Sequence, residues 1–266
     1  MKTTVTREII RIENGEKQQV TDLIVSEYAL TVKVNQQEIV TMVCTPEYVE
    51  DMVIGYLVSE RILHYKDIED IWHQEEEGFV HIKARKVNPF VQQLQNKRYL
   101  TSCCGMSRQG FVFASDALAS KNLEDVKLSI APEDCFRLMK EMQDSAQVFK
   151  QTGGVHNAAL CDVKGIVISR MDIGRHNALD KIYGYCLQNN IPVKDKIIVF
   201  SGRISSEILM KVSKIGCAMV LSKSAPTELA LNLAEQLGIT TVGFIRNESM
   251  NIYTHPERIR LTKEGD

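Results

Sequence analysis

The chain has 266 residues, of which 44 % are hydrophobic and 25 % are charged, and its formal net charge is −2. This length and composition are typical of a soluble globular protein of one large or two modest domains, and the near-neutral charge gives no support to a nucleic-acid partner. No run approaches the ~20 apolar residues of a membrane span, and the N-terminus lacks an apolar signal region, so we expect a cytoplasmic protein without membrane contact.

The first third of the chain predicts strands and hairpins around one helix. Residues 28–34 and 39–44 are β-rich runs separated by a polar segment, and residues 78–84 predict a further strand. Thr45 and Pro46 fit an N-cap and a first helical position, and apolar residues at helical spacing extend that helix to about Leu63. We therefore expect a strand-rich N-terminal α+β domain over residues 1–125.

Residues 98–125 show a looser pattern that predicts a mobile connection between domains. It contains the adjacent Cys103 and Cys104, near several cationic residues that would favour a thiolate. Such a pair fits either a reactive thiol or a chance pair of loop cysteines. The other five cysteines lie within or beside apolar runs, and no Cys-x-x-Cys is present, so we predict neither a zinc site nor a disulfide framework.

From about residue 152 the chain alternates short strands with helices. Strands are predicted at residues 155–161, 165–169, 196–200, 217–221 and 240–245, and helices at residues 132–148, 175–188, 205–215 and 227–237. Gly216 and Gly238 stand where C-terminal glycine caps are expected. This alternation indicates crossover connections, and therefore an α/β domain with a largely parallel sheet over residues 126–266.

Polar and cationic residues follow three of these strands. Ser201, Gly202 and Arg203 follow the strand at 196–200, Lys223 follows the next one, and Arg246 follows the last. Open α/β sheets bind ligands beyond the carboxyl ends of their strands, where helix N-termini and arginine side chains suit phosphate. Ordinary capping would explain one cluster, but three at corresponding positions favour a phosphate-bearing ligand.

Residues 172–181 (DIGRHNALDK) gather six ionisable or amide side chains at the start of an amphipathic helix. A helix start needs only one capping residue, so this density suggests a bound polar ligand near Asp172, Arg175 and His176. His156 follows a glycine pair and begins a predicted strand. A zinc deaminase would require His-x-Glu and a later Pro-Cys-x-x-Cys, and the chain has neither, so zinc-dependent deamination is excluded.

Several motifs in one order resemble the FdhD family of sulfur carrier proteins, and the resemblance spans nearly the whole chain. They are residues 101–106 (TSCCGM), 153–159 (GGVHNAA), 172–181 (DIGRHNALDK), 200–207 (FSGRISSE), 222–227 (SKSAPT), 243–247 (GFIRN) and 253–258 (YTHPER). The resemblance implies a C-terminal domain with a cytidine deaminase-like three-layer α/β fold that lacks zinc, beside the smaller strand-rich N-terminal domain.

The resemblance also implies a sulfur relay. A cysteine desulfurase would load a loop cysteine as a persulfide, and the sulfur would pass to a bis(molybdopterin guanine dinucleotide) cofactor of molybdenum or tungsten. The cofactor would then be inserted into formate dehydrogenase. A homodimer is expected from the same likeness and from the frequency of symmetric oligomers.

The cysteine loop departs from the pattern of many members, which carry Cys-Gly-x-Cys. Here Cys104 takes the first position, but Ser107 stands at the second. Transfer through one persulfide remains chemically complete, because the outer sulfur is itself the transferable group. We therefore predict Cys104 as the carrier and Cys103 as an auxiliary.

The predicted cofactor contacts combine the strand-end clusters with a segment that the resemblance assigns to the guanine dinucleotide. They are Phe244, Ile245, Arg246, Asn247, Glu248, Ser249, Ser201, Gly202, Arg203, Lys223, Asp172, Arg175, His176 and His156. Two alternatives stay open. One is a cofactor chaperone without sulfur chemistry, and the other is a hydrolase that uses His156 or His176 with Asp172 or Asp180.

Overall fold

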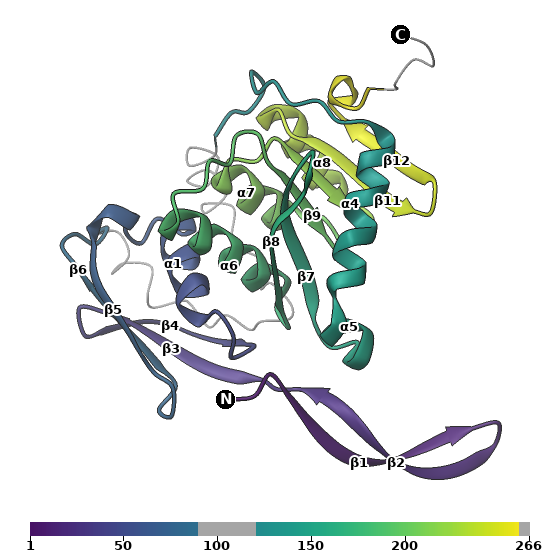
Figure 1. Cartoon of the computed structure of the whole chain (residues 1–266). Coiled ribbons are helices and arrows are strands. Elements are labelled where there is room, and N and C mark those ends of the chain that lie inside the picture. Colours follow the sequence, from purple (N-terminus) through teal and green to yellow (C-terminus); the bar gives the residue numbers. More distant parts are fainter. Residues whose placement is uncertain (90–120, 261–266) are drawn as a thin grey trace.

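The computed structural model describes residues 1–89 and 121–260 of the chain. These residues form a strand-rich N-terminal unit and a larger C-terminal unit in which helices cover a central sheet (Figure 1). The predicted fold class, an α/β C-terminal part beside a smaller strand-rich part, is confirmed. Cys103 and Cys104 lie outside the described residues, as does most of the predicted connection between the domains.

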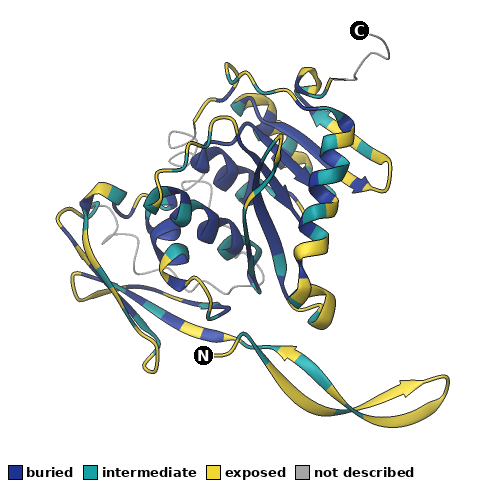
Figure 2. Cartoon of the chain, in the orientation of Figure 1, coloured by how far each residue is buried: buried dark blue, intermediate teal, exposed yellow. Residues whose placement is uncertain are grey.

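The N-terminal unit begins with an antiparallel hairpin of β1 (Thr4–Glu13) and β2 (Glu16–Val25). It projects away from the rest of the molecule and is largely exposed (Figure 2). This hairpin was not predicted from the sequence. Because neither of its faces is buried, apolar and polar residues do not alternate along it, and the period-two signal of a half-buried strand is missing.

Four further strands form the sheet of this unit in the order β4-β3-β6-β5. Their bounds are β3 (Tyr28–Val34), β4 (Gln37–Cys44), β5 (Ile68–Gln74) and β6 (Phe79–Ala84), and a short 3-10 helix, η1 (Tyr65–Asp67), precedes β5. Helix α1 (Val49–Ser59) covers one face, where Leu30, Val32 and Met52 are fully buried. The predicted hairpin at 28–44 and the strand near residues 78–84 are confirmed.

The predicted helix start at Thr45 and Pro46 is wrong. Helix α1 begins at Val49 after Tyr48, whose φ is 55°, and it ends at Ser59 rather than near Leu63. Thr45 is fully buried instead, and its backbone N–H and hydroxyl both donate to Asp172 Oδ2. A partner 127 residues along the chain therefore decides the role of this threonine, where its neighbours in sequence suggested a cap.

The C-terminal unit is built on a six-stranded sheet in the order β12-β11-β10-β9-β7-β8. The strands are β7 (His156–Asp162), β8 (Gly165–Asp172), β9 (Ile197–Phe200), β10 (Met219–Ser222), β11 (Thr240–Arg246) and β12 (Ser249–Thr254). The prediction of a largely parallel sheet is wrong, because β9, β10 and β11 run parallel while β7, β8 and β12 pair antiparallel. Short turns join β7 to β8 and β11 to β12, and such turns permit only antiparallel pairing.

Helices cover both faces of this sheet and give the predicted three layers. One face carries α6 (Arg175–Gln188), α7 (Ser206–Ile215) and α8 (Glu228–Leu237), and the other carries α4 (Pro132–Ser145), followed by α5 (Gln147–Thr152). A 3-10 helix, η3 (Pro256–Arg258), lies near the end of the described chain. The side chains of Ser205 and Thr227 cap α7 and α8, and left-handed Gly216 and Gly238 end these helices. The two glycine caps are as the sequence predicts.

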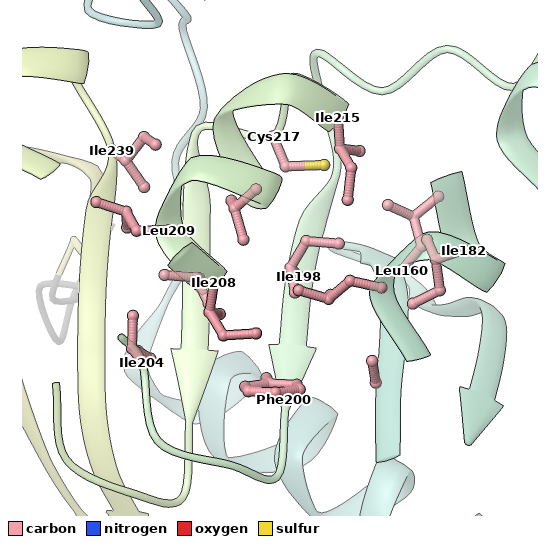
Figure 3. Close-up of a cluster of buried hydrophobic side chains, with 14 of the residues drawn as sticks. Leu160, Ile182, Ile198, Phe200, Ile204, Ile208, Leu209, Ile215, Cys217 and Ile239 are labelled. Atoms are coloured by element: carbon pink, nitrogen blue, oxygen red, sulfur yellow. The ribbon is translucent and has the colours of Figure 1, made fainter. Parts of the chain in front are cut away.

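Alternate residues of each central strand enter different cores. Leu160, Ile198 and Phe200 pack under α6 and α7 (Figure 3), whereas Cys161 and Val199 pack under α4. Both faces of these central strands are buried, which explains why the short strands are continuous apolar runs in the sequence. In the two described ranges, no helix combines the length and apolar character needed to cross a membrane.

The two units meet where α1 crosses α6. A Cβ added to Gly55 of α1 would lie 1.9 Å from the carbonyl oxygen of Asp180, and one added to Gly184 of α6 would lie 1.8 Å from that of Asp51. The two backbones are therefore in direct contact through glycines. The predicted division at residues 125 and 126 stays a prediction, although Leu123 is already buried in the core of the C-terminal unit.

Candidate functional site

One edge of the six-stranded sheet collects the predicted site residues. β7 runs antiparallel to both β8 and β9, so its first residue, His156, pairs with Asp172 at the end of β8 and lies at the carboxyl end of β9. The carboxyl ends of β10 and β11 lie at the same edge, because both run parallel to β9. The structure thus brings together residues from five strands where an open sheet forms its ligand crevice.

The starts of α6 and α7 lie beside these strand ends. His176 Nε2 lies 3.1 Å from Oε2 of Glu207, a residue in the first turn of α7 that the predicted set omitted. Burial, and then the nearby charge of Arg175, lower the pKa of His156, so its imidazole is mainly neutral at pH 7. Glu207 could have been predicted from the sequence, because it is the last residue of the motif at 200–207 that carries the family resemblance.

Gly202 lets the loop after β9 pass close to two rings. An added Cβ would lie 3.1 Å from the Phe200 ring and 3.4 Å from His156 Nδ1. Such a side chain would push these rings away, which is a physical reason for glycine at this position.

Serine hydroxyls hold the loops after β9 and β10 together. Ser201 Oγ accepts from the Asn157 N–H at 2.9 Å, Ser222 Oγ donates to the Gly202 carbonyl at 2.8 Å, and Ser224 Oγ donates to the Ser201 carbonyl at 3.1 Å. Ser201 thus has a framework role, and its contact with phosphate stays a prediction.

Three cations project along this edge. Arg203, Lys223 and Arg246 are all exposed and follow or end three consecutive strands, β9, β10 and β11. No ion pair among the described residues involves Arg203 or Lys223, and the guanidinium of Arg246 lies 5.8 Å from the centroid of the Phe244 ring. Exposed cations at successive strand ends are suited to a ligand that carries more than one phosphate.

The segment 244–249 forms the end of the β11–β12 hairpin. Phe244 has a φ of 52° beside a register shift, and Asn247, with a φ of 50°, opens the turn that Glu248 completes before Ser249. Left-handed backbone at a bulky residue is costly and tends to occur at functional sites. It places the Phe244 ring at the surface with 38 % exposure, whereas Ile245 is 1 % exposed and belongs to the core. The Ile245 side chain thus faces the interior, and the predicted contact of this residue with the cofactor stays a prediction that only its backbone could fulfil.

Residues 172–181 divide into a buried and an open part. Asp172, Asp180 and Lys181 are buried within the protein, whereas Arg175 and His176 are half-buried at the start of α6. Lys181 pairs with Asp172 at 2.8 Å, so the carboxylate predicted to touch the ligand belongs to the framework beneath it. Asp172, Asp180 and Lys181 of this segment therefore bond residues at the junction between the two units rather than a ligand.

The same burial disfavours the hydrolase alternative. Asp180 lies 2.6 Å from Lys211 Nζ and also accepts from the Ser59 hydroxyl, and Asp172 is held by Lys181. Neither carboxylate orients His156 or His176 as a general base would require. Within residues 1–89 and 121–260, no group of three His, Cys, Asp or Glu side chains is placed to hold a metal ion.

The five described cysteines are all buried. Burial raises the pKa of Cys44, Cys135 and Cys161 to about 12 and that of Cys186 to about 11, and it raises the pKa of Cys217 as well. Thiols that stay protonated at neutral pH are poor nucleophiles. The prediction that these five are core residues is confirmed.

A thiol count would test this assignment. We expect iodoacetamide at pH 7.5 to leave the five buried cysteines unmodified in the native protein and to modify all seven cysteines in urea. Peptide mass spectrometry would identify the alkylated positions, with Cys104 expected among those modified in the native state. Native alkylation of Cys135 or Cys217 would contradict the assignment.

Comparison with known proteins gives consistent matches over almost the whole chain. The family model described as the FdhD/NarQ family matches residues 25–260. A protein of Shouchella clausii named Sulfur carrier protein FdhD is 56 % identical over 259 residues, covering 96 % of both chains. A protein of the same name from Bacillus subtilis is 51 % identical over 260 residues, covering 97 % of this chain and 98 % of its own.

A solved structure shares the fold. It is described as a formate dehydrogenase accessory protein from Desulfotalea psychrophila, and it matches with a TM-score of 0.80 at 21 % identity. The match covers 97 % of this chain and 100 % of that one. The resemblance inferred from the motifs is confirmed, and the chain belongs to the FdhD/NarQ family.

Proposed function

We propose that this protein is a sulfur carrier that accepts sulfur as a persulfide on Cys104. It then delivers the sulfur to the bis(molybdopterin guanine dinucleotide) cofactor of molybdenum or tungsten, before insertion into formate dehydrogenase. A cysteine desulfurase is the donor, and the transfer takes place in the cytoplasm. The observation that carries the proposal is the 56 % identity, over 96 % of both chains, to a protein named as a sulfur carrier.

The cysteine inventory supports Cys104 as the reactive residue. Five of the seven cysteines are buried with raised pKa values, which leaves Cys103 and Cys104 as the candidates. The Cys104 thiolate would attack the outer sulfur of the donor persulfide. The donor sulfur–sulfur bond would break, the donor thiolate would leave, and a persulfide would form on Cys104 without any external oxidant. Cys103 would act as an auxiliary.

The edge of the sheet supports binding of the cofactor as cargo. Its pyrophosphate groups suit Arg203, Lys223 and Arg246, which offer charge-assisted hydrogen bonds. The exposed Phe244 ring beside Arg246 offers a stacking surface for guanine. Arg175, His176 and His156 would receive a further part of the cargo at the starts of α6 and β7.

Binding of GDP tests the cradle, by which we mean the three exposed cations Arg203, Lys223 and Arg246 together with the Phe244 ring. Arg203→Ala and Arg246→Ala are each expected to raise the dissociation constant for GDP by about ten- to a hundredfold. This is the range that follows from the loss of one hydrogen bond to a charged group. The matched control is Arg11→Ala, which removes an exposed arginine from the projecting β1–β2 hairpin and should leave the affinity unchanged. Isothermal titration calorimetry at fixed salt gives the three values, and equal affinities would refute the cradle.

A cofactor chaperone without sulfur chemistry is the second candidate, because Ser107 stands where the family resemblance implies a second loop cysteine. It predicts nucleotide binding but no gain of sulfur after incubation with a desulfurase and cysteine. We also expect the protein to be a homodimer, which light scattering coupled to size-exclusion chromatography would measure.

A further inference from the structure

We infer that Thr45, Asp172 and Lys181 act as positioning residues that couple the N-terminal unit to the start of α6 at the cargo site. With Gly174 and Asn177 they form what we name the Asp172 cluster. The inference rests on the proposed function, because the start of α6 carries Arg175 and His176. It assigns a role in the site to residues that never reach its surface.

One carboxylate oxygen of Asp172 faces the N-terminal unit. Its Oδ2 accepts from the Thr45 N–H at 2.9 Å and from the Thr45 hydroxyl at 3.1 Å, and it lies 2.8 Å from Lys181 Nζ. Lys181 also donates to Thr45 Oγ1 at 2.6 Å and to the Met171 carbonyl at 3.1 Å. Thr45, Asp172 and Lys181 are all fully buried.

The other oxygen of Asp172 faces the start of α6. Its Oδ1 accepts from the Gly174 N–H at 2.8 Å and from Asn177 Nδ2 at 2.9 Å, and Asn177 Nδ2 also donates to the Val43 carbonyl at 2.9 Å. Gly174 is the N-cap of α6 and has no side chain with which to cap it. Asp172 therefore holds the N-cap residue by its backbone and the third residue of the helix by its side-chain amide, although no side chain caps the helix itself.

The two halves of the carboxylate make a mechanical link. The end of β4 in the N-terminal unit is tied through Thr45 to Asp172, and through Asp172 to the turn from which Arg175 and His176 project. A buried ion pair adds little net stability compared with apolar packing, but it satisfies its partners in only one arrangement. The cluster therefore fixes the place of the α6 start relative to the N-terminal unit.

A second buried pair at the same junction provides a matched control. Arg170 lies 2.8 Å from Asp51 of α1, and the Gln188 amide at the last residue of α6 donates to Asp51 at 2.7 Å. This pair also joins the two units and is nearly as buried, with 8 % and 13 % exposure. It acts at the opposite end of α6 and bonds no residue of the first turn.

The test compares two double variants, Asp172→Ala with Lys181→Met and Asp51→Ala with Arg170→Met. Each removes both charges, so that neither leaves an unpaired buried ion. We expect similar losses in melting temperature for both. Only the Asp172 variant should speed hydrogen exchange of amides 175–178, by roughly five- to tenfold, the effect of losing about one of the hydrogen bonds that hold this turn. It should also raise the dissociation constant for GDP by about tenfold, which corresponds to 1.4 kcal/mol. The reason is that Arg175 and His176 project from the turn that Asp172 holds.

Equal exchange at residues 175–178 in the two double variants would overturn the inference. If the wild-type protein does not bind GDP, the cargo proposal fails while the exchange measurement still decides the coupling. If the Asp172 double variant does not fold, Thr45→Val takes its place. It removes the bridging hydroxyl with little change of shape and should speed exchange at the start of α6. Thr45→Ser should restore the wild-type rate, and a failure of serine to do so would contradict the coupling.

Discussion

Replacing Cys104 with alanine is expected to abolish sulfur loading and, with it, the maturation of formate dehydrogenase. The persulfide forms on a thiolate, and alanine offers no atom to which the sulfur can attach. After incubation with a cysteine desulfurase and cysteine, intact-protein mass spectrometry should show the addition of one sulfur atom to the wild type and none to Cys104→Ala. Formate dehydrogenase activity in a strain that carries only this variant should be undetectable.

The matched control is Cys103→Ala, which removes the adjacent thiol. If Cys103 is an auxiliary, this variant keeps the added sulfur and loses only part of the activity. GDP affinity and melting temperature should be unchanged in both variants, which separates sulfur chemistry from folding and cargo binding. Normal maturation with Cys104→Ala would eliminate the persulfide role and leave the cofactor chaperone as the function.

The replacement of Gly184 by alanine is expected to destabilise the protein by about 3 kcal/mol or more, above the usual cost of overpacking. Alanine in a helix interior normally stabilises by roughly 0.5–1 kcal/mol relative to glycine, so the expected sign is reversed here. The reason is that the new Cβ would lie 1.8 Å from the Asp51 carbonyl oxygen, and backbone atoms of a packed helix have no room to retreat. Urea unfolding gives the free energy.

Gly55→Ala should have a similar effect from the other side of the crossing, since its Cβ would meet the Asp180 carbonyl. The double variant should cost less than the sum of the two, because the helices need to separate only once. Glu50→Ala, at an exposed position of α1, is the control and should change the free energy of unfolding by no more than about 0.5 kcal/mol. An unchanged stability in Gly184→Ala would show that the two helices are not in backbone contact.

Local sequence signals were sufficient to predict most helices and strands of the C-terminal unit. Helix α6 is found at residues 175–188 as predicted, because its apolar stripe repeats at helical spacing. Ser205 and Thr227 cap α7 and α8, and Gly216 and Gly238 end them, because capping chemistry acts within a few residues of the helix end. The parallel character of the sheet was overestimated, because a strand's direction is set by its pairing partners rather than by its own residues.

The location of the candidate site also followed from the sequence. Arg203, Lys223 and Arg246 were predicted to meet because each follows a strand, and the strand order places their strands side by side. The sequence could not distinguish surface from framework within residues 172–181. Asp172 looks the same in sequence whether it faces a ligand or Lys181, and only the packing of the end of β8 against Thr45 of the N-terminal unit decides between them.

The sequence by itself determined the family, the bounds of α6, α7 and α8 to within one residue, and the edge of the sheet where the cations gather, and it predicted Cys104 as the carrier. These properties depend on local periodicity, on short-range capping and on motifs that survive as strings of residues. The helix predicted at residues 132–148 is instead two helices, α4 and α5. Only the tertiary structure decided that Thr45 bonds Asp172, that Ile245 is buried and that Gly55 and Gly184 bring two helices into contact. Each of these depends on atoms that are distant along the chain, and the packing of the two units brings them together.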